Sequence, residues 1–156
     1  MNALDLSTTS PRSPYATLGD LPWLARLLDK ARAHLAGTMG DYLPYPCGGD
    51  RRFLDTFGLD AEALLAQVAT GADDRAMVEW VRAEATEDLE EGTRALLRAF
   101  ALPIPADDAE RQEALAKAKA DLLTSKPEAD LSWVDNFTKL ILAEEGHDRT
   151  GLALKS

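Results

Sequence analysis

The chain is short of the residues that build disulfides, metal clusters and large sheets. Its one cysteine, Cys47, excludes an intramolecular disulfide framework and a zinc site made of several cysteines. Two isoleucines and four valines among 156 residues are too few β-branched aliphatic side chains for the strands of an ordinary sheet. The chain has 26 alanines and 25 leucines instead, and these residues lose least on entering a helix. The composition therefore predicts an all-α protein.

Positive charge and long apolar runs are also scarce. Lysine and arginine number 17 against 27 aspartates and glutamates, which gives a net charge of −10. A general basic surface is therefore excluded, because binding to phosphate backbones depends on lysine and arginine. No apolar run approaches the roughly 18 residues of a membrane span, and residues 1–10 lack the basic start and apolar core of a secretory signal. We expect a cytoplasmic protein with no nucleic-acid or membrane partner.

The acidity is unevenly distributed along the chain. Residues 1–54 hold six lysines and arginines against five acids, whereas residues 55–156 hold eleven against twenty-two. Acidic residues in the later part serve solubility and helix starts. The first third is nearly neutral and locally cationic, so the exclusion of anion binding is weaker there, and it holds the loops to be tested first.

Apolar residues recur at helical spacing along most of the chain. The pattern predicts about seven short helices in one irregular bundle. These helices are expected to open at Asp20, Asp50, Asp60, Asp73 or Asp74, Thr86, Asp107, and Asp130 or Ser132. They are expected to end near Gly37, Gly58, Gly71, Pro103, Lys126-Pro127 and Gly146. We expect an N-terminal extended segment over 1–19, a single helical domain over 20–146 and a C-terminal tail over 147–156.

Two stretches do not fit regular helix, namely Pro11–Gly19 and Gly37–Gly49. Together they hold four of the eight prolines, five of the ten glycines, all three tyrosines and the only cysteine. The second forms a Pro/Gly/Tyr-rich loop after the first helix. Such loops form ligand sites when a rigid scaffold fixes them, but the same residues also serve as plain turn chemistry between two helices. Both interpretations stay open.

The first helix carries a polar stripe beside these loops. Arg26, Lys30 and His34 follow one another at a spacing of four residues, and Asp29 can pair within the helix. A stripe of this kind is usually a solvated face. Alternatively, it meets Arg12 and the loop tyrosine to form an anion pocket. The candidate ligand-binding residues are Arg12, Lys30, His34, Tyr42, Cys47 and Arg51.

Metal, nucleophile and phosphate motifs are weak in this sequence. His34 and Cys47 lack the partners at fixed spacing that a metal site or a cysteine enzyme needs, so we expect no metal and no cofactor. The run from Gly48 to Arg52 places two glycines and two arginines at a helix start. It can hold an anion, or it is simply a helix start with solvated arginines, since Asp50 competes for the same backbone donors.

Part of the sequence resembles a known family. The resembling residues are Pro11-Arg12-Ser13-Pro14, Leu18-Gly19, Asp29–Ala33, Gly37, Gly40-Asp41-Tyr42 and Phe53–Asp60. In these residues the chain is similar to the bacterial domain of unknown function catalogued as family 5069. The resemblance implies a small bacterial cytosolic protein. It brings no established activity and no catalytic residues.

Two classes of function follow from these observations. The first is a non-enzymatic helical module that binds a partner protein or a small anionic ligand, because no catalytic signature accompanies the loops. Homodimerisation through Trp23 or Trp80 fits this class, although both tryptophans fit a core equally well. The second is an enzyme acting on a small acidic metabolite, with His34, Tyr42 or Cys47 as acid or nucleophile. Its pocket is expected near Arg12, Lys30, His34 and Tyr42.

Overall fold

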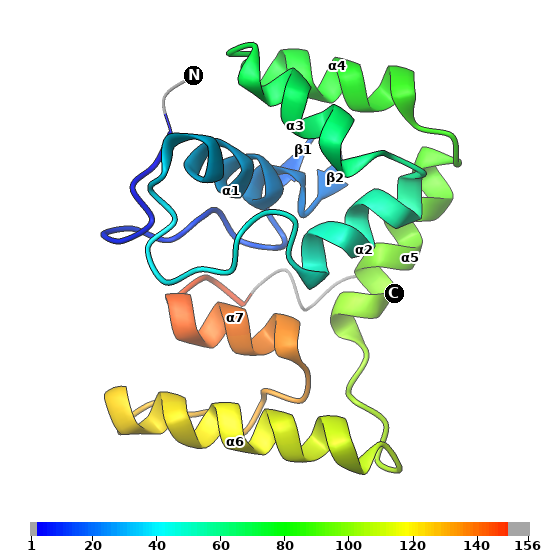
Figure 1. Ribbon diagram of the computed structural model, residues 1–156. Coiled ribbons are helices and arrows are strands. Elements are labelled where there is room, and N and C mark those ends of the chain that lie inside the picture. The colour runs from blue at the N-terminus through cyan, green and yellow to red at the C-terminus, as the bar shows by residue number, and fades with distance from the viewer. Residues whose placement is uncertain (1–2, 150–156) are drawn as a thin grey trace. The chain divides into compact units, whose positions relative to one another are not determined.

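The computed structural model describes residues 3–149 and is mainly helical (Figure 1). Its elements are β1 (Thr17–Leu18), β2 (Leu21–Pro22), α1 (Leu24–Ala36), α2 (Gly48–Phe57), α3 (Ala61–Ala69), α4 (Asp74–Glu84), α5 (Leu89–Ala101), α6 (Ala109–Ser125) and α7 (Phe137–Glu145). The all-α prediction is confirmed, with a small two-stranded sheet added. Contacts group the chain into two compact units, Met1–Leu97 and Arg98–Ser156.

The start of the first helix differs from the prediction. Asp20 does not cap α1; it lies in the two-residue turn of an antiparallel hairpin in which Leu18 pairs with Leu21. Gly19 and Asp20 both have positive φ, at 55° and 65°, which matches the turn geometry that suits the twist of tight hairpins. Pro22 therefore ends β2 instead of entering the helix. The buried Trp23, itself at φ 70°, takes the N-cap position.

Several predicted helix ends are confirmed. The carboxylates of Asp60 and Asp73 accept hydrogen bonds from Ala63 N and Ala76 N, at 2.8 and 2.9 Å. Gly37 closes α1 in the left-handed region at φ 72°, where glycine avoids the steric cost that a Cβ would bring. Gly58 and Gly146 close α2 and α7 in the same way.

Thr86 and Asp130 do not open helices because their side chains serve other contacts, and the start of α6 is displaced by one residue. Thr86 lies before α5 and donates to Gly58 O at 3.4 Å, while Asp88 caps that helix through Glu91 N at 2.8 Å. Asp108, not Asp107, caps α6, as its carboxylate accepts from Arg111 N.

The start of α7 is displaced for a similar reason. The Asp130 carboxylate closes a local turn by accepting from Ser132 N at 3.0 Å. The helix therefore begins at Phe137, where the Asn136 side chain accepts from Lys139 N at 2.8 Å.

The core of the first unit lies among α1, α2, α3 and α4. Its fully buried side chains include Leu24, Leu27, Leu28, Phe53, Phe57, Leu64, Met77 and Val81. Phe53 and Phe57 meet edge to face, with ring centroids 4.9 Å apart. Helix α1 contacts both α3 and β1, so it lies at the centre of this unit. The long connection from α1 to α2 is the cyan loop of Figure 1.

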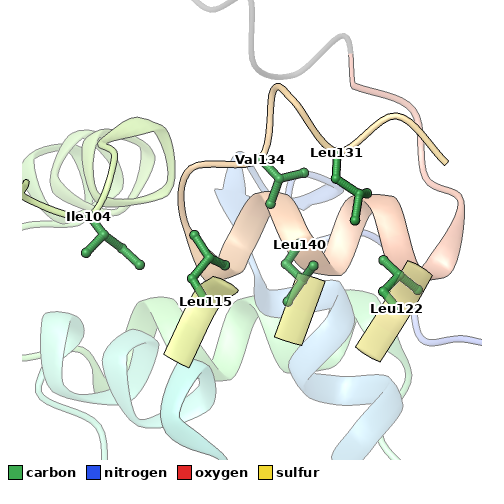
Figure 2. Packing of buried hydrophobic residues seen from close by; sticks show 6 residues of the cluster. All are labelled: Ile104, Leu115, Leu122, Leu131, Val134 and Leu140. Atoms are coloured by element: carbon green, nitrogen blue, oxygen red, sulfur yellow. The ribbon is translucent and has the colours of Figure 1, made fainter. Parts of the chain in front are cut away.

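The second unit has a core of its own, shown in Figure 2. It consists of Ile104, Leu115, Leu122, Leu131, Val134 and Leu140. The Asn136 amide donates to Phe100 O and Leu102 O at 2.9 and 2.7 Å. These bonds fix the proline-containing corner after α5 to the start of α7.

Candidate functional site

The polar stripe of α1 is buried. Arg26, Asp29, Lys30 and Arg32 are only 3%, 5%, 3% and 6% exposed. The stripe is therefore part of the interior of the first unit. Charged residues are rarely buried unless they are paired, so partners for these side chains are expected nearby. The solvated-face interpretation is therefore wrong for these four residues. His34, the last polar residue of the stripe, is exposed.

Arg12 holds the N-terminal segment against this helix. Its guanidinium donates to the Asp29 carboxylate at 3.0 and 3.1 Å and to Asp74 at 2.9 Å. Its backbone N also donates to Asp29, at 2.9 Å. Burial lowers the pKa of the guanidinium, but the hydrogen bonds to Asp74 and Asp29 outweigh burial and raise the pKa above its usual value. Arg12 therefore contacts the first helix, as one interpretation expected, but its guanidinium faces two carboxylates and not the loop tyrosine.

Asp74, at the start of α4, joins two arginines. It accepts from Arg12 and from Arg32, the latter at 2.8 Å. Arg32 also donates to Ala72 O at 3.2 Å. Burial favours the neutral acid, but the hydrogen bonds from both arginines dominate and hold the pKa of Asp74 below its ordinary value. The cluster of Arg12, Asp29, Arg32 and Asp74 thus ties three segments of the unit together.

Lys30 lies in a second cluster, beneath the start of α2. Its Nζ is 2.7 Å from Cys47 Sγ and 3.4 Å from Asp50 Oδ2. Asp50 is 0% exposed, and it also accepts from Trp23 Nε1 at 2.9 Å and from Cys47 N at 3.0 Å. Helix α2 therefore begins earlier than expected, with Cys47 as N-cap and Asp50 inside the first turn. Three donors therefore converge on the buried Asp50 carboxylate, and one of them, the Lys30 ammonium, also contacts the half-buried thiol.

The other predicted site residues lie elsewhere. The exposed His34 ring lies 6.4 Å from the Tyr45 ring, between centroids. Tyr45 donates to Ala61 O at 2.9 Å, and burial, followed by the charges of Asp50 and Asp60, raises its pKa. Tyr42 OH donates to Ser10 Oγ at 3.2 Å.

The structure therefore brings two of the six candidates into direct contact. Lys30 touches Cys47, while Arg12 belongs to the other cluster on α1. Arg51 lies on the exposed side of α2. Within residues 3–149, His34 makes no hydrogen bond to Cys47, so the acid and nucleophile of the enzymatic interpretation are not linked.

A cavity of the first unit is lined by none of the six candidate residues. It has a volume of about 340 Å³, within the range of small-molecule sites. Its lining residues come from the hairpin turn, α4 and α5: Gly19, Asp20, Leu21, Arg82, Leu89, Glu90, Thr93 and Arg94. We call it the hairpin cavity. It was missed because its lining depends on the β1–β2 turn, whose only sequence signal was the Gly19-Asp20 pair.

Comparison with known proteins gives one clear result. The model of the family described as a domain of unknown function, DUF5069, matches residues 8–146. The chain belongs to this family. A search of curated proteins finds no match.

The DUF5069 match covers both polar clusters of α1 and the hairpin cavity.

Within the described residues, no group of three or more histidines, cysteines, aspartates or glutamates is arranged to hold a metal ion. None of the helices in that part of the chain combines the length and apolar character that crossing a membrane requires.

Proposed function

We propose that the protein is a non-enzymatic module that binds a small anionic ligand in the hairpin cavity. Arg82 carries this proposal. Its guanidinium donates to a neutral group, Gly19 O, at 3.0 Å, and no carboxylate pairs with it across residues 3–149. Its positive charge is therefore available to an anion. By contrast, Arg12 and Lys30 already face aspartates.

The lining of the cavity favours a monocarboxylate with a short apolar body. Two arginines and two acids line it, so a multiply charged phosphate would be repelled by Asp20 and Glu90. Arg94 is paired with Glu90 at 3.0 Å, which leaves Arg82 as the principal anion contact. Leu21 and Leu89 offer apolar surface beside it. A guanidinium matches the two oxygens of a carboxylate well.

Calorimetric titration of the full chain with acetate, butyrate and inorganic phosphate tests the proposal. We expect butyrate to bind more tightly than acetate, because it adds apolar contact, and phosphate to bind most weakly. Arg82→Gln should weaken butyrate binding by about tenfold or more, since a hydrogen bond to a charged group contributes about 1.5–3 kcal/mol and about 1.4 kcal/mol is tenfold. Arg94→Gln, which leaves the hairpin contact of Arg82 intact, should weaken binding less.

Arg75→Gln is the matched control. Arg75 lies on the same helix with its side chain 89% exposed, and its loss should leave butyrate binding unchanged. Absence of heat with all three anions would refute the proposal, as would equal weakening in Arg75→Gln and Arg82→Gln. Self-association in sedimentation, without carboxylate binding, would favour the homodimer or partner-protein alternative and overturn the choice of ligand.

A further inference from the structure

The contact between Lys30 and Cys47 is unusually close for its atom types. Lys30 Nζ lies 2.7 Å from Cys47 Sγ. Hydrogen bonds from nitrogen to oxygen span about 2.7–3.2 Å, and sulfur is a larger atom than oxygen, so an ordinary bond to sulfur is longer. A separation this short is close to that of a nitrogen and a sulfur that are both bonded to one oxygen atom.

The surroundings hold the two reactive atoms together. The Lys30 side chain is 4% exposed, and Asp50, at 0%, lies 3.4 Å from its Nζ. Asp50 is fixed in turn by hydrogen bonds from Trp23 Nε1 and from the backbone N of Cys47. Cys47 itself is only half-buried. Cys47 is therefore the more exposed of the two residues, and the amine beside it is held by an ion pair with Asp50.

We infer that Lys30 and Cys47 form an oxidative covalent bridge, in which one oxygen atom joins Nζ to Sγ, with hydrogen peroxide as the oxidant. This modification site is independent of the hairpin cavity. Cysteine sulfur is oxidised in its thiolate form, and accessible thiolates react first. An amine that already touches the sulfur is placed to react at that position once the sulfur is oxidised.

The reaction consumes two molecules of peroxide. In the first step the Cys47 thiolate attacks one peroxide oxygen, the O–O bond breaks, and a sulfenic acid and hydroxide form, so sulfur loses two electrons. In the second step a new N–O bond forms between Lys30 and the sulfenic oxygen as the second peroxide is reduced to water and nitrogen loses two electrons. Overall, an ammonium, a thiolate and two peroxides give the bridge and three waters.

The bridge would join α1 to the start of α2, through residues 17 positions apart in sequence. Because Cys47 is the only cysteine, no intramolecular disulfide competes with it. Every change of the thiol therefore reports on this one position.

Intact-mass measurement of the full chain after peroxide treatment tests the inference. We expect a product that has gained one oxygen and lost two hydrogens, in which trypsin no longer cleaves after Lys30 and one cross-linked peptide contains both residues. A thiol reductant should restore the original mass. Lys30→Arg should give only sulfenic or higher acids, and Lys119→Arg, whose lysine contacts Val134 O, should behave as the wild type.

Two results would overturn the inference without depending on any variant. One is wild-type protein that gains whole oxygens only, with cleavage after Lys30 intact. The other is a disulfide-linked dimer as the sole oxidation product, seen on a non-reducing gel. Formation of the same bridged mass in Lys30→Arg would assign the chemistry to another amine and would equally refute it.

Discussion

At the scale of single residues, Asp50 organises much of the polar interior of the first unit. One fully buried carboxylate faces the ammonium of Lys30, the indole of Trp23 and the backbone N of Cys47. Its position in the first turn of α2 also suits the partial positive charge of a helix N-terminus. The sequence pattern predicted Asp50 at the start of this helix. Nothing in the pattern indicated that Lys30 would be buried against the Asp50 side chain.

Replacing Asp50 tests how much this cluster stabilises the fold. Asp50→Asn keeps an acceptor for Trp23 but leaves the Lys30 ammonium buried without a counter-charge. Breaking a buried pair in this way costs about 3–5 kcal/mol, which should appear as a lower free energy of unfolding in urea. Asp55→Asn, on the exposed side of the same helix, should change stability by less than about 0.5 kcal/mol. Equal stability of the two variants would contradict this account of the cluster.

Asp74 should make the free energy of unfolding depend on pH in the acid range. Its pKa is lowered in the folded protein, so its contribution is present above the unfolded value of about 3.9 and is lost as pH falls through the folded value. The destabilisation caused by Asp74→Asn should therefore be largest near neutral pH and shrink in acid, as measured by denaturant unfolding at several pH values.

The matched control for Asp74 is Glu79→Gln. Glu79 is a 69% exposed acid on the same helix, and its removal should show little of this pH dependence. A destabilisation by Asp74→Asn that stays constant from neutral pH into acid would show that its ion pairs do not stabilise the fold.

At the scale of elements, the chain's helices were largely predictable and its hairpin was not. The helical spacing of apolar residues predicts the helices, and the glycine stops predict where α1, α2 and α7 end. The starts of α1, α5 and α7 were misplaced because Asp20, Thr86 and Asp130 serve a turn or a neighbouring element. Local capping rules do not contain such contacts. The burial of the stripe was not predicted, because its partners Asp50 and Asp74 are distant in sequence; only the contact of Arg12 with this helix was expected, as one of two interpretations.

The two glycines that open α2 should respond differently to alanine. A Cβ at Gly49 would overlap Trp23 Cζ2, whereas a Cβ at Gly48 meets nothing within 4 Å. Gly49→Ala should therefore destabilise the protein by about 1–3 kcal/mol through overpacking. Gly48→Ala should be neutral or slightly stabilising, because alanine favours the helix. Thermal unfolding of both variants measures the difference, and identical midpoints would contradict the packing of Trp23 on Gly49.

At the scale of the whole molecule, the charge of −10 lies mostly on exposed acids. Self-repulsion of like charges weakens the folded state, and salt screens exposed charges more than buried pairs. Raising sodium chloride from about 0.01 M to about 0.15 M, which shortens the screening length from about 30 to about 8 Å, should therefore raise the unfolding temperature. A lower unfolding temperature in salt would show that attractive pairs dominate.

A charge-reduced variant is the control for this salt effect. Glu87 and Glu91 lie in the acidic run at the start of α5 and are exposed. The double substitution Glu87→Gln and Glu91→Gln should have a smaller salt response than the wild type. An unchanged response would mean that this run does not contribute to the repulsion.

The central proposal places the ligand at the hairpin cavity and not at Lys30 and Cys47. Titration of isotope-labelled protein with butyrate, followed by backbone amide NMR, distinguishes the two places directly. Saturable shifts are expected for Gly19, Leu21 and Thr93, which line the cavity. Shifts confined to the region of Lys30 and Cys47, or no shifts at all, would contradict it.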